Sequence, residues 1–327
     1  MRKALIFTAV LFAVPLFAQT SKAGQAGAKF LSLPYSVRGE SMGGAFVSLV
    51  SDPSAVFYNP AGAALVDRSA LYAMAGSWWG AYDYALSYSA PRKNGVLSIF
   101  LSGVYMGGIE SYELTPSEEI VYKGEIAYLA TQLGVGYATF LTDKFAVGMN
   151  AKLIYEGYGG YTTAYSFAID AGTYYYTGFR DFVLGSSIRH FGFDAKLSGE
   201  YVRYEYTNEL VETTVTYTAY KLPTTYSIGL SGTLYKNNIS RLIGAVELFH
   251  PVDNLESYNF GLEYSILNMI FIRAGYKLYV KTREAVGDSN GFTLGLGLKY
   301  GKFTFDYGYY NKGIMPPINQ IAFMMQF

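Results

Sequence analysis

Apolar and polar residues alternate with a period of two along most of the chain after residue 68. In the segment 292–300 the apolar side chains stand at even positions, with glycine, threonine or lysine between them. The segments 303–309, 145–153 and 270–281 alternate in the same way. Successive side chains of a β-strand point to opposite faces, so the pattern predicts strands with one apolar and one polar or small face.

Segment length separates two kinds of β protein that would both alternate. Strands of soluble sheets average about five to six residues, whereas a tilted membrane-crossing strand needs about ten. Many segments here are that long, and aromatic residues gather near their ends, as in the girdles of membrane barrels. We therefore expect an all-β, antiparallel, transmembrane β-barrel rather than a soluble sandwich. Its fourteen predicted strands are 69–78, 82–90, 95–104, 126–140, 144–156, 164–176, 179–190, 222–236, 240–250, 256–266, 268–281, 290–300, 302–311 and 318–327.

The connections between these strands alternate in length. Those after even-numbered strands are mostly tight turns, whereas long ones follow odd-numbered strands, at 105–125, 191–222, 281–289 and 311–317. Outer-membrane barrels have short periplasmic turns and longer extracellular loops, which would place both termini in the periplasm. The stretch 191–222 is predicted to form an extended extracellular hairpin, whose role stays open.

The first eighteen residues have the features of a secretory signal peptide. Arg2 and Lys3 precede an apolar run from Ala4 to Phe17, and Ala18 is a small residue at the expected cleavage site. Leu16 is larger than usual before such a site, which leaves open a slightly later cleavage. The run is short for a membrane-spanning helix. A retained membrane anchor is the alternative to removal of residues 1–18.

Composition excludes several classes of protein. Charged residues make up 15% of the chain, aromatic residues 17%, and the formal net charge is zero. Such a chain is not disordered, and the neutral balance gives no electrostatic case for nucleic acid. With no cysteine, disulfides, thiolate catalysis and cysteine zinc sites are excluded.

Residues 34–66 do not alternate and contain two helix-start signals. Asp52-Pro53 and Asn59-Pro60 each place a capping side chain before a proline. Gly43, Gly44 and the alanines nearby permit close approach to a wall. We expect residues 19–67 to form a compact, partly helical plug inside the barrel of residues 68–327.

This stretch resembles the opening of the FadL-type outer-membrane transporter superfamily, in particular its PorV/PorQ branch. The resemblance continues through later motifs, including Gly261-Leu262-Glu263-Tyr264 and Arg273-Ala274-Gly275-Tyr276, over most of the chain. It implies a fourteen-stranded barrel with the N-terminal segment in the lumen. The matching hatch positions are Met42, Gly43, Gly44, Asn59, Pro60, Ala61 and Gly62. The alternative for the Asn-Pro-Ala-Gly motif is a helix cap that only holds the plug together.

Four basic residues on polar strand faces are candidates for lining the lumen: Lys152, Arg273, Lys277 and Lys299. They would either attract an anionic head group or form ion pairs with plug carboxylates such as Glu40 and Asp52.

The last predicted strand ends in an aromatic residue. Phe323, Met325 and the terminal Phe327 share one apolar face with Ile321. A terminal aromatic residue resembles the signal that bacterial barrel-assembly machinery reads. This machinery and outer-membrane lipid are therefore expected partners.

Groups that could carry chemistry are few. His190 and His250 are the only histidines, and both are predicted at the outer rim of strands, as girdle residues. No serine stands in a nucleophile elbow, and the Gly-Leu-Gly of residues 295–297 lies in a strand with no helix after it. We predict no enzyme activity, no cofactor and no metal.

Two functions remain after these exclusions. The resemblance implies passive uptake or binding of hydrophobic small molecules at the bacterial outer membrane. The PorV/PorQ branch also includes type IX secretion accessories, non-enzymatic barrels that hold secreted cargo proteins at the cell surface.

Overall fold

The computed structural model describes residues 24–78, 80–115, 119–206, 210–280, 291–312 and 315–327. The predicted signal peptide and the connection 281–289 lie outside the described residues. Among the described residues, none of the helices combines the length and apolar character needed to cross a membrane.

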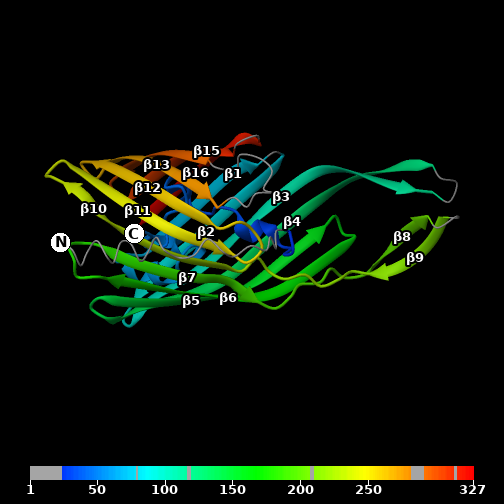
Figure 1. Ribbon diagram of the computed structural model, residues 1–327, viewed down its shortest axis with the longest axis horizontal. Coiled ribbons are helices and arrows are strands. Elements are labelled where there is room, and N and C mark those ends of the chain that lie inside the picture. The colour runs from blue at the N-terminus through cyan, green and yellow to red at the C-terminus, as the bar shows by residue number, and fades with distance from the viewer. Residues whose placement is uncertain (1–23, 79, 116–118, 207–209, 281–290, 313–314) are drawn as a thin grey trace.

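Fourteen strands form one closed antiparallel barrel (Figure 1). Each strand pairs with its neighbours in sequence, except that β7 pairs with β10 and β1 closes the ring with β16. The predicted number of barrel strands is confirmed. Their bounds are β1 Ala70–Trp78, β2 Ala81–Arg92, β3 Gly95–Leu114, β4 Ile120–Thr142, β5 Phe145–Tyr158, β6 Thr162–Tyr176, β7 Val183–Gly192, β10 Thr225–Lys236, β11 Ser240–Pro251, β12 Ser257–Ile266, β13 Ile270–Tyr279, β14 Gly291–Tyr300, β15 Phe303–Lys312 and β16 Met315–Gln326.

Side-chain alternation sets the two faces of the wall. On β14 the outward Leu294, Leu296 and Leu298 are about half exposed, whereas Thr293 between β13 and β15 is buried. Many inward positions carry small or polar residues, and larger inward residues such as Phe100 and Tyr310 contact the N-terminal segment in the lumen. Outward positions carry leucine, isoleucine and aromatic residues. This is the arrangement that the period-two pattern predicts.

Two hairpins project beyond the rest of the wall. Strands β3 and β4 continue together through most of the predicted loop 105–125, with pairs from Val96↔Ala138 to Leu114↔Ile120. The predicted loop is therefore wrong for most of its length. A second hairpin, β8 (Glu200–Tyr206) with β9 (Leu210–Thr216), confirms the predicted hairpin in 191–222. Figure 1 shows both projecting from the same end of the barrel.

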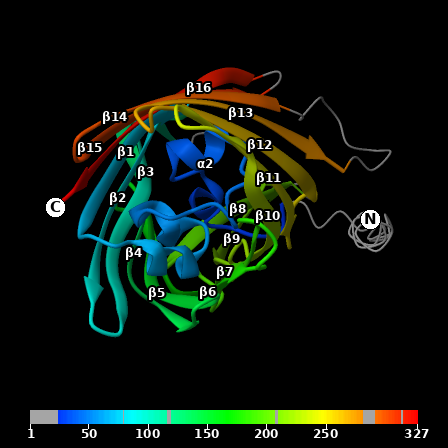
Figure 2. The same ribbon diagram turned by 90° about the vertical axis from the view of Figure 1, so that its left-hand side faces the viewer.

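The N-terminal segment, residues 24–66, lies inside the ring of strands (Figure 2). It contains the helix α2 (Val37–Ser41) and three 3-10 helices, η1 (Lys29–Ser32), η2 (Pro53–Phe57) and η3 (Pro60–Leu65). Asp52 caps η2, and Asn59 caps η3, as the two Asx-Pro pairs predict. The segment touches opposite sides of the ring: α2 contacts β13 to β16, and η3 contacts β3 to β6.

The two described chain ends lie at opposite ends of the barrel. The Phe327 N–H donates to the carbonyl of Ser69, which precedes β1 at the short-turn end. At the other end, Ala26 forms a β-bridge with Lys221, and the Gly24 N–H donates to the Asp253 carbonyl. Residues 221 and 253 belong to connections at the hairpin end. The predicted N-terminus after residue 18 lies outside the described residues, so the prediction that both termini lie with the short turns stays a prediction for that end.

Candidate functional site: the N-terminal segment in the lumen

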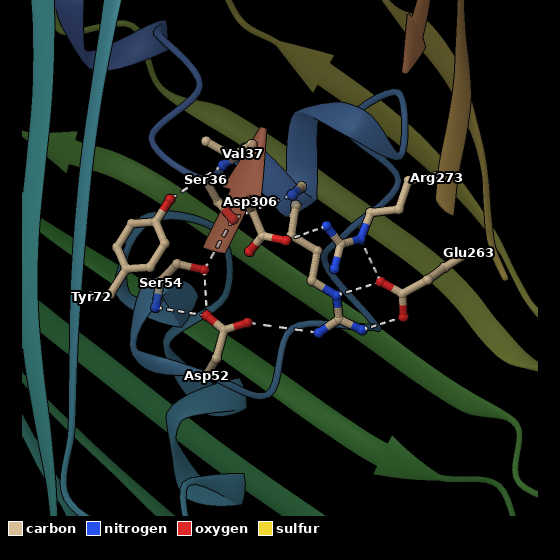
Figure 3. Close-up of polar contacts among 10 residues, drawn as sticks. Ser36, Val37, Asp52, Ser54, Tyr72, Glu263, Arg273 and Asp306 are labelled. Carbon is tan, nitrogen blue, oxygen red and sulfur yellow. Dashed lines mark hydrogen bonds and ion pairs between the residues drawn. The ribbon is translucent and has the colours of Figure 1, made fainter. Parts of the chain in front are cut away.

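A buried network of charges joins α2 to the barrel wall (Figure 3). Glu263 of β12 accepts hydrogen bonds at 2.8 Å from both Nε and Nη2 of Arg38, a bidentate pair. Arg273 of the neighbouring β13 donates to Glu263 at 2.7 Å and to Asp306 of β15 at 2.5 Å. Bidentate arginine–carboxylate pairs are strong and geometrically specific, so this network fixes the position of α2.

The same arginine connects α2 to η2. Asp52 lies 3.7 Å from Arg38 Nη1 and accepts the Ser54 N–H at 2.9 Å. On the wall side, the Val37 N–H donates to the hydroxyl of Tyr72 at 3.2 Å. Burial alone would lower the pKa of Arg38, but the Glu263 carboxylate raises it above its usual range. Arg38 therefore stays charged and holds the three elements together.

Asn59 fastens η3 to the wall. Its side-chain oxygen accepts the Ala61 N–H at 3.1 Å, and its amide nitrogen donates to the carbonyls of Val47 and Thr173 at 2.7 and 2.9 Å. Asn59 therefore contacts β6 as well as capping η3. The helix cap predicted for the Asn-Pro-Ala-Gly motif is present. The same Asn59 side chain also binds the segment to the wall, so its role goes beyond capping.

The turn at Met42-Gly43-Gly44 contacts the opposite wall. Gly43 has φ +68°, a conformation that favours glycine, and its N–H donates to Thr293 at 3.0 Å. A Cβ at Gly43 would stand 2.7 Å from the Tyr276 nitrogen and 2.8 Å from the Phe260 oxygen. Gly43 therefore packs directly against the backbone of the wall. A larger residue would clash there and would also disfavour the positive φ.

Three of the four predicted luminal cations form ion pairs, each with different partners. Lys277 pairs with Glu40 of α2 at 3.5 Å, as the ion-pair alternative predicts. Lys152 pairs within the wall, with Asp170 of β6 at 2.8 Å, and Arg273 belongs to the Glu263 network. Lys299 is half-buried, and no ion pair of Lys299 occurs among the described residues.

The two histidines do not share one environment. His250 is exposed and lies beside the ring of Tyr226 and Glu256, as expected of a rim residue. His190 is buried: its Nδ1 lies 2.7 Å from the Lys152 ammonium, and its N–H donates to Asp170. The prediction of His190 as a girdle residue is wrong because a bulge in β7 turns it inward.

The predicted assembly residues lie on the outer face of β16, at the short-turn end. The ring centroid of Phe323 is 5.0 Å from that of Phe305, and Met325 pairs across the strands with Phe303. Phe327 is exposed and packs edge-on against Tyr88.

Two hollows adjoin the segment. One, of about 240 Å³, lies in the lumen between the segment and strands β11 to β13. The other is an apolar groove of about 830 Å³ on the outer face of β4 to β7, β10 and β11. Thr173 contributes to this groove, and its carbonyl accepts from Asn59 on the inside. Only the backbone of β6 separates Asn59 from the groove at this point.

Chemistry-bearing clusters are scarce in the described part of the chain. No group of three or more His, Asp or Glu side chains there is arranged to hold a metal ion. Sequence reasoning selected Arg273 and the motifs containing Arg38 and Glu263, but not the network that joins them. It also missed Arg189 and the buried position of His190, because a bulge leaves no signal in an alternating pattern.

The fold is similar to that of solved hydrocarbon channels. No protein-family model and no curated protein sequence matches the chain. The Pseudomonas putida toluene transporter TodX aligns with TM-score 0.60 and 13% identity, over 89% of this chain and 96% of that one. The monoaromatic hydrocarbon channel CymD aligns with TM-score 0.64 and 10% identity, over 90% of this chain and 97% of that one. A Pseudomonas aeruginosa FadL homologue aligns with TM-score 0.55 and 12% identity, over 90% of this chain and 99% of that one.

Proposed function

We propose that this protein is a FadL-type channel of the bacterial outer membrane that takes up or binds hydrophobic small molecules. The single observation that carries the proposal is the closed fourteen-stranded barrel with residues 24–66 fastened across its lumen. The shared fold with TodX, CymD and the FadL homologue supports it. Within that superfamily we assign the chain to the PorV/PorQ branch, on the motifs of residues 38–62.

The wall suits a lipid environment and a hydrophobic cargo. Outward leucine, isoleucine and aromatic side chains surround the barrel, as in the apolar band of outer-membrane barrels. The outer groove at Thr173 lies opposite Asn59, where the wall carries glycine on its inner side at Gly148 and Gly172. We propose that a hydrophobic molecule leaves the lumen here when residues 59–62 move.

The proposal assigns the segment the role of a hatch. Deletion of residues 38–65 is expected to leave the barrel inserted and to raise its leak to small polar solutes in liposomes. Unchanged permeability of the deletion variant would mean that the segment does not close the path.

Ligand binding tests the cargo directly. Burial of an acyl chain contributes about 0.8 kcal/mol per CH₂, so the affinity for fatty acids of eight to eighteen carbons should rise steeply with length. Binding would be measured on the detergent-purified full chain. A flat dependence on length, or no binding, would argue against the channel.

One observation favours the second candidate, a type IX secretion accessory. The hairpins β3–β4 and β8–β9 project well beyond the other strands and expose aromatic residues, including Tyr112, Tyr122 and Tyr201. Such a surface suits a protein partner better than a small solute. If fatty acids do not bind, capture of a secreted cargo protein by the intact barrel, abolished by deletion of residues 198–217, would establish this alternative.

A further inference from the structure

The cavity of about 240 Å³ in the lumen lies above the hatch, on the side of the long hairpins. One side of it is bordered by Lys29 and by residues 32–34, and another by Glu40, Gly44 and Tyr58. Strands β11 to β13, the connection containing Asp253, Trp78 of β1 and Arg189 of β7 complete the lining. A solute that enters from the hairpin end would therefore meet this cavity before it meets the hatch.

One cation of the cavity stands apart from the others. Lys29 is paired with Asp253, and Lys277 is paired with Glu40. Arg189, at the β7 bulge, has no carboxylate within ion-pair distance among the described residues. Its guanidinium donates to the carbonyl of Phe57 at 2.5 Å, and its Nε is buried without a hydrogen-bond partner.

The surroundings of Arg189 suit a flat, negatively charged molecule. Its guanidinium carbon lies 5.5 Å from the ring centroid of Tyr58, so the cation covers an aromatic face that also borders the cavity. The nearby carboxylate of Glu247 already accepts the N–H groups of Phe46 and Val47. Among the described residues, Arg189 is therefore the cation of this lining that forms no ion pair, and Glu247, the carboxylate there without one, is directed at backbone N–H groups instead.

We propose that this cavity binds a compact organic monoanion, a single-ring aromatic carboxylate, through the Arg189 guanidinium. Its volume is that of about eight water molecules in the liquid, enough for one ring with a carboxylate but not for a long acyl chain. Charge-assisted hydrogen bonds from arginine to a carboxylate are roughly twice as strong as neutral ones. The inference rests on the proposed function, because it makes the cavity the first binding site on the channel's path.

Three single-ring probes of similar size test the charge requirement. Calorimetry on the detergent-purified full chain would compare benzoate, neutral benzamide and cationic benzylamine. Benzoate is expected to bind at least about tenfold more tightly than benzamide, with no measurable binding of benzylamine. Equal affinities for benzoate and benzamide would overturn the proposal.

A matched pair of variants tests the residue. R189Q is expected to weaken benzoate binding at least about tenfold, whereas R241Q, at an exposed arginine paired with Asp181, should leave it unchanged. Unchanged benzoate affinity in R189Q would exclude this site. If R189Q does not fold, S32W fills the cavity and retains Arg189. Loss of benzoate binding in S32W supports the site, and retained binding overturns it.

Separate measurements distinguish this site from the channel. Benzoate binding needs no transport, whereas permeation of a neutral hydrophobic compound into liposomes needs no Arg189. Benzoate binding without permeation would refute the proposed channel function and support the anion site. Permeation without benzoate binding would refute the anion site and would not affect the proposed channel function.

Discussion

Replacement of Glu263 by glutamine should release the N-terminal segment from the wall. Glu263 accepts three hydrogen bonds from two arginines, the partly buried Arg38 of the segment and the buried Arg273 of the wall. Glutamine has almost the same shape but no charge, so E263Q leaves both guanidinium groups without their shared carboxylate. The wall keeps the Arg273–Asp306 pair, whereas the ion pair left to Arg38 among the described residues is its longer contact with Asp52. The segment should therefore be affected more than the barrel.

The expected size of this effect follows from the burial of the network. Removal of one partner from a buried ion pair costs about 3–5 kcal/mol. We take about 3 kcal/mol for the docking of the segment, because Asp52 remains beside Arg38. Each 1.4 kcal/mol is a factor of ten in an equilibrium constant. The population with an undocked segment should therefore rise about 100-fold.

A buried thiol can report this population, because the chain has no native cysteine. Ser48 is buried at the wall, and S48C is nearly isosteric. The rate of maleimide labelling of S48C in liposome-embedded protein should rise about 100-fold in E263Q, together with the leak to small polar solutes. E256Q, at an exposed carboxylate beside His250, is the matched control and should change neither. If E263Q labels at the rate of the parent, the network does not hold the segment.

Three further outcomes are expected from other contacts. N59A removes a cap worth about 1 kcal/mol and the donors to Val47 and Thr173, so solute leak should rise in liposomes while the heat-modifiable gel shift of the barrel stays. G43A should lower the thermal midpoint of the purified protein by several degrees more than A64G does, because its Cβ would meet the backbone of β12 and β13. Removal of Phe327 should reduce the yield of heat-modifiable barrel in outer-membrane fractions without changing the precursor level, and an unchanged yield would exclude an assembly role.

The sequence predicts the barrel wall well and the parts beyond it less well. Within the wall, one face of each strand meets the outside and the other meets a filled lumen. Outward apolar side chains therefore alternate with inward polar or small ones, and this alternation identifies each strand in the sequence. Where β3 and β4 project, both faces are exposed, and the alternation is no longer required. The stretch 105–125 therefore has no strand pattern, although it continues the same hairpin. The bulge at His190 escapes prediction for a related reason, because one extra residue changes the face without changing the composition.

The candidate site shows a similar limit. The prolines and capping residues of residues 52–60 specify η2 and η3 locally, so these turns can be predicted from neighbouring residues alone. The partners of Arg38 cannot be predicted from neighbouring residues, because Glu263 is 225 positions away in the sequence. The inward face of β12 shows that a charge is present at residue 263, but the identity of its partner depends on where the segment lies in three dimensions.

The distribution of ion pairs explains why the wall should stand without the segment. Arg273 pairs with Glu263 and Asp306, and Lys152 pairs with Asp170, all between strands of the wall. If residues 38–65 are deleted, these charges keep their partners, and Lys277 is the wall cation that loses its carboxylate, Glu40. Because an unpaired luminal cation can be solvated once the lumen is open to water, its cost in free energy is small compared with that of a buried charge. The segment therefore depends on the wall for its position more than the wall depends on the segment, as a movable hatch requires.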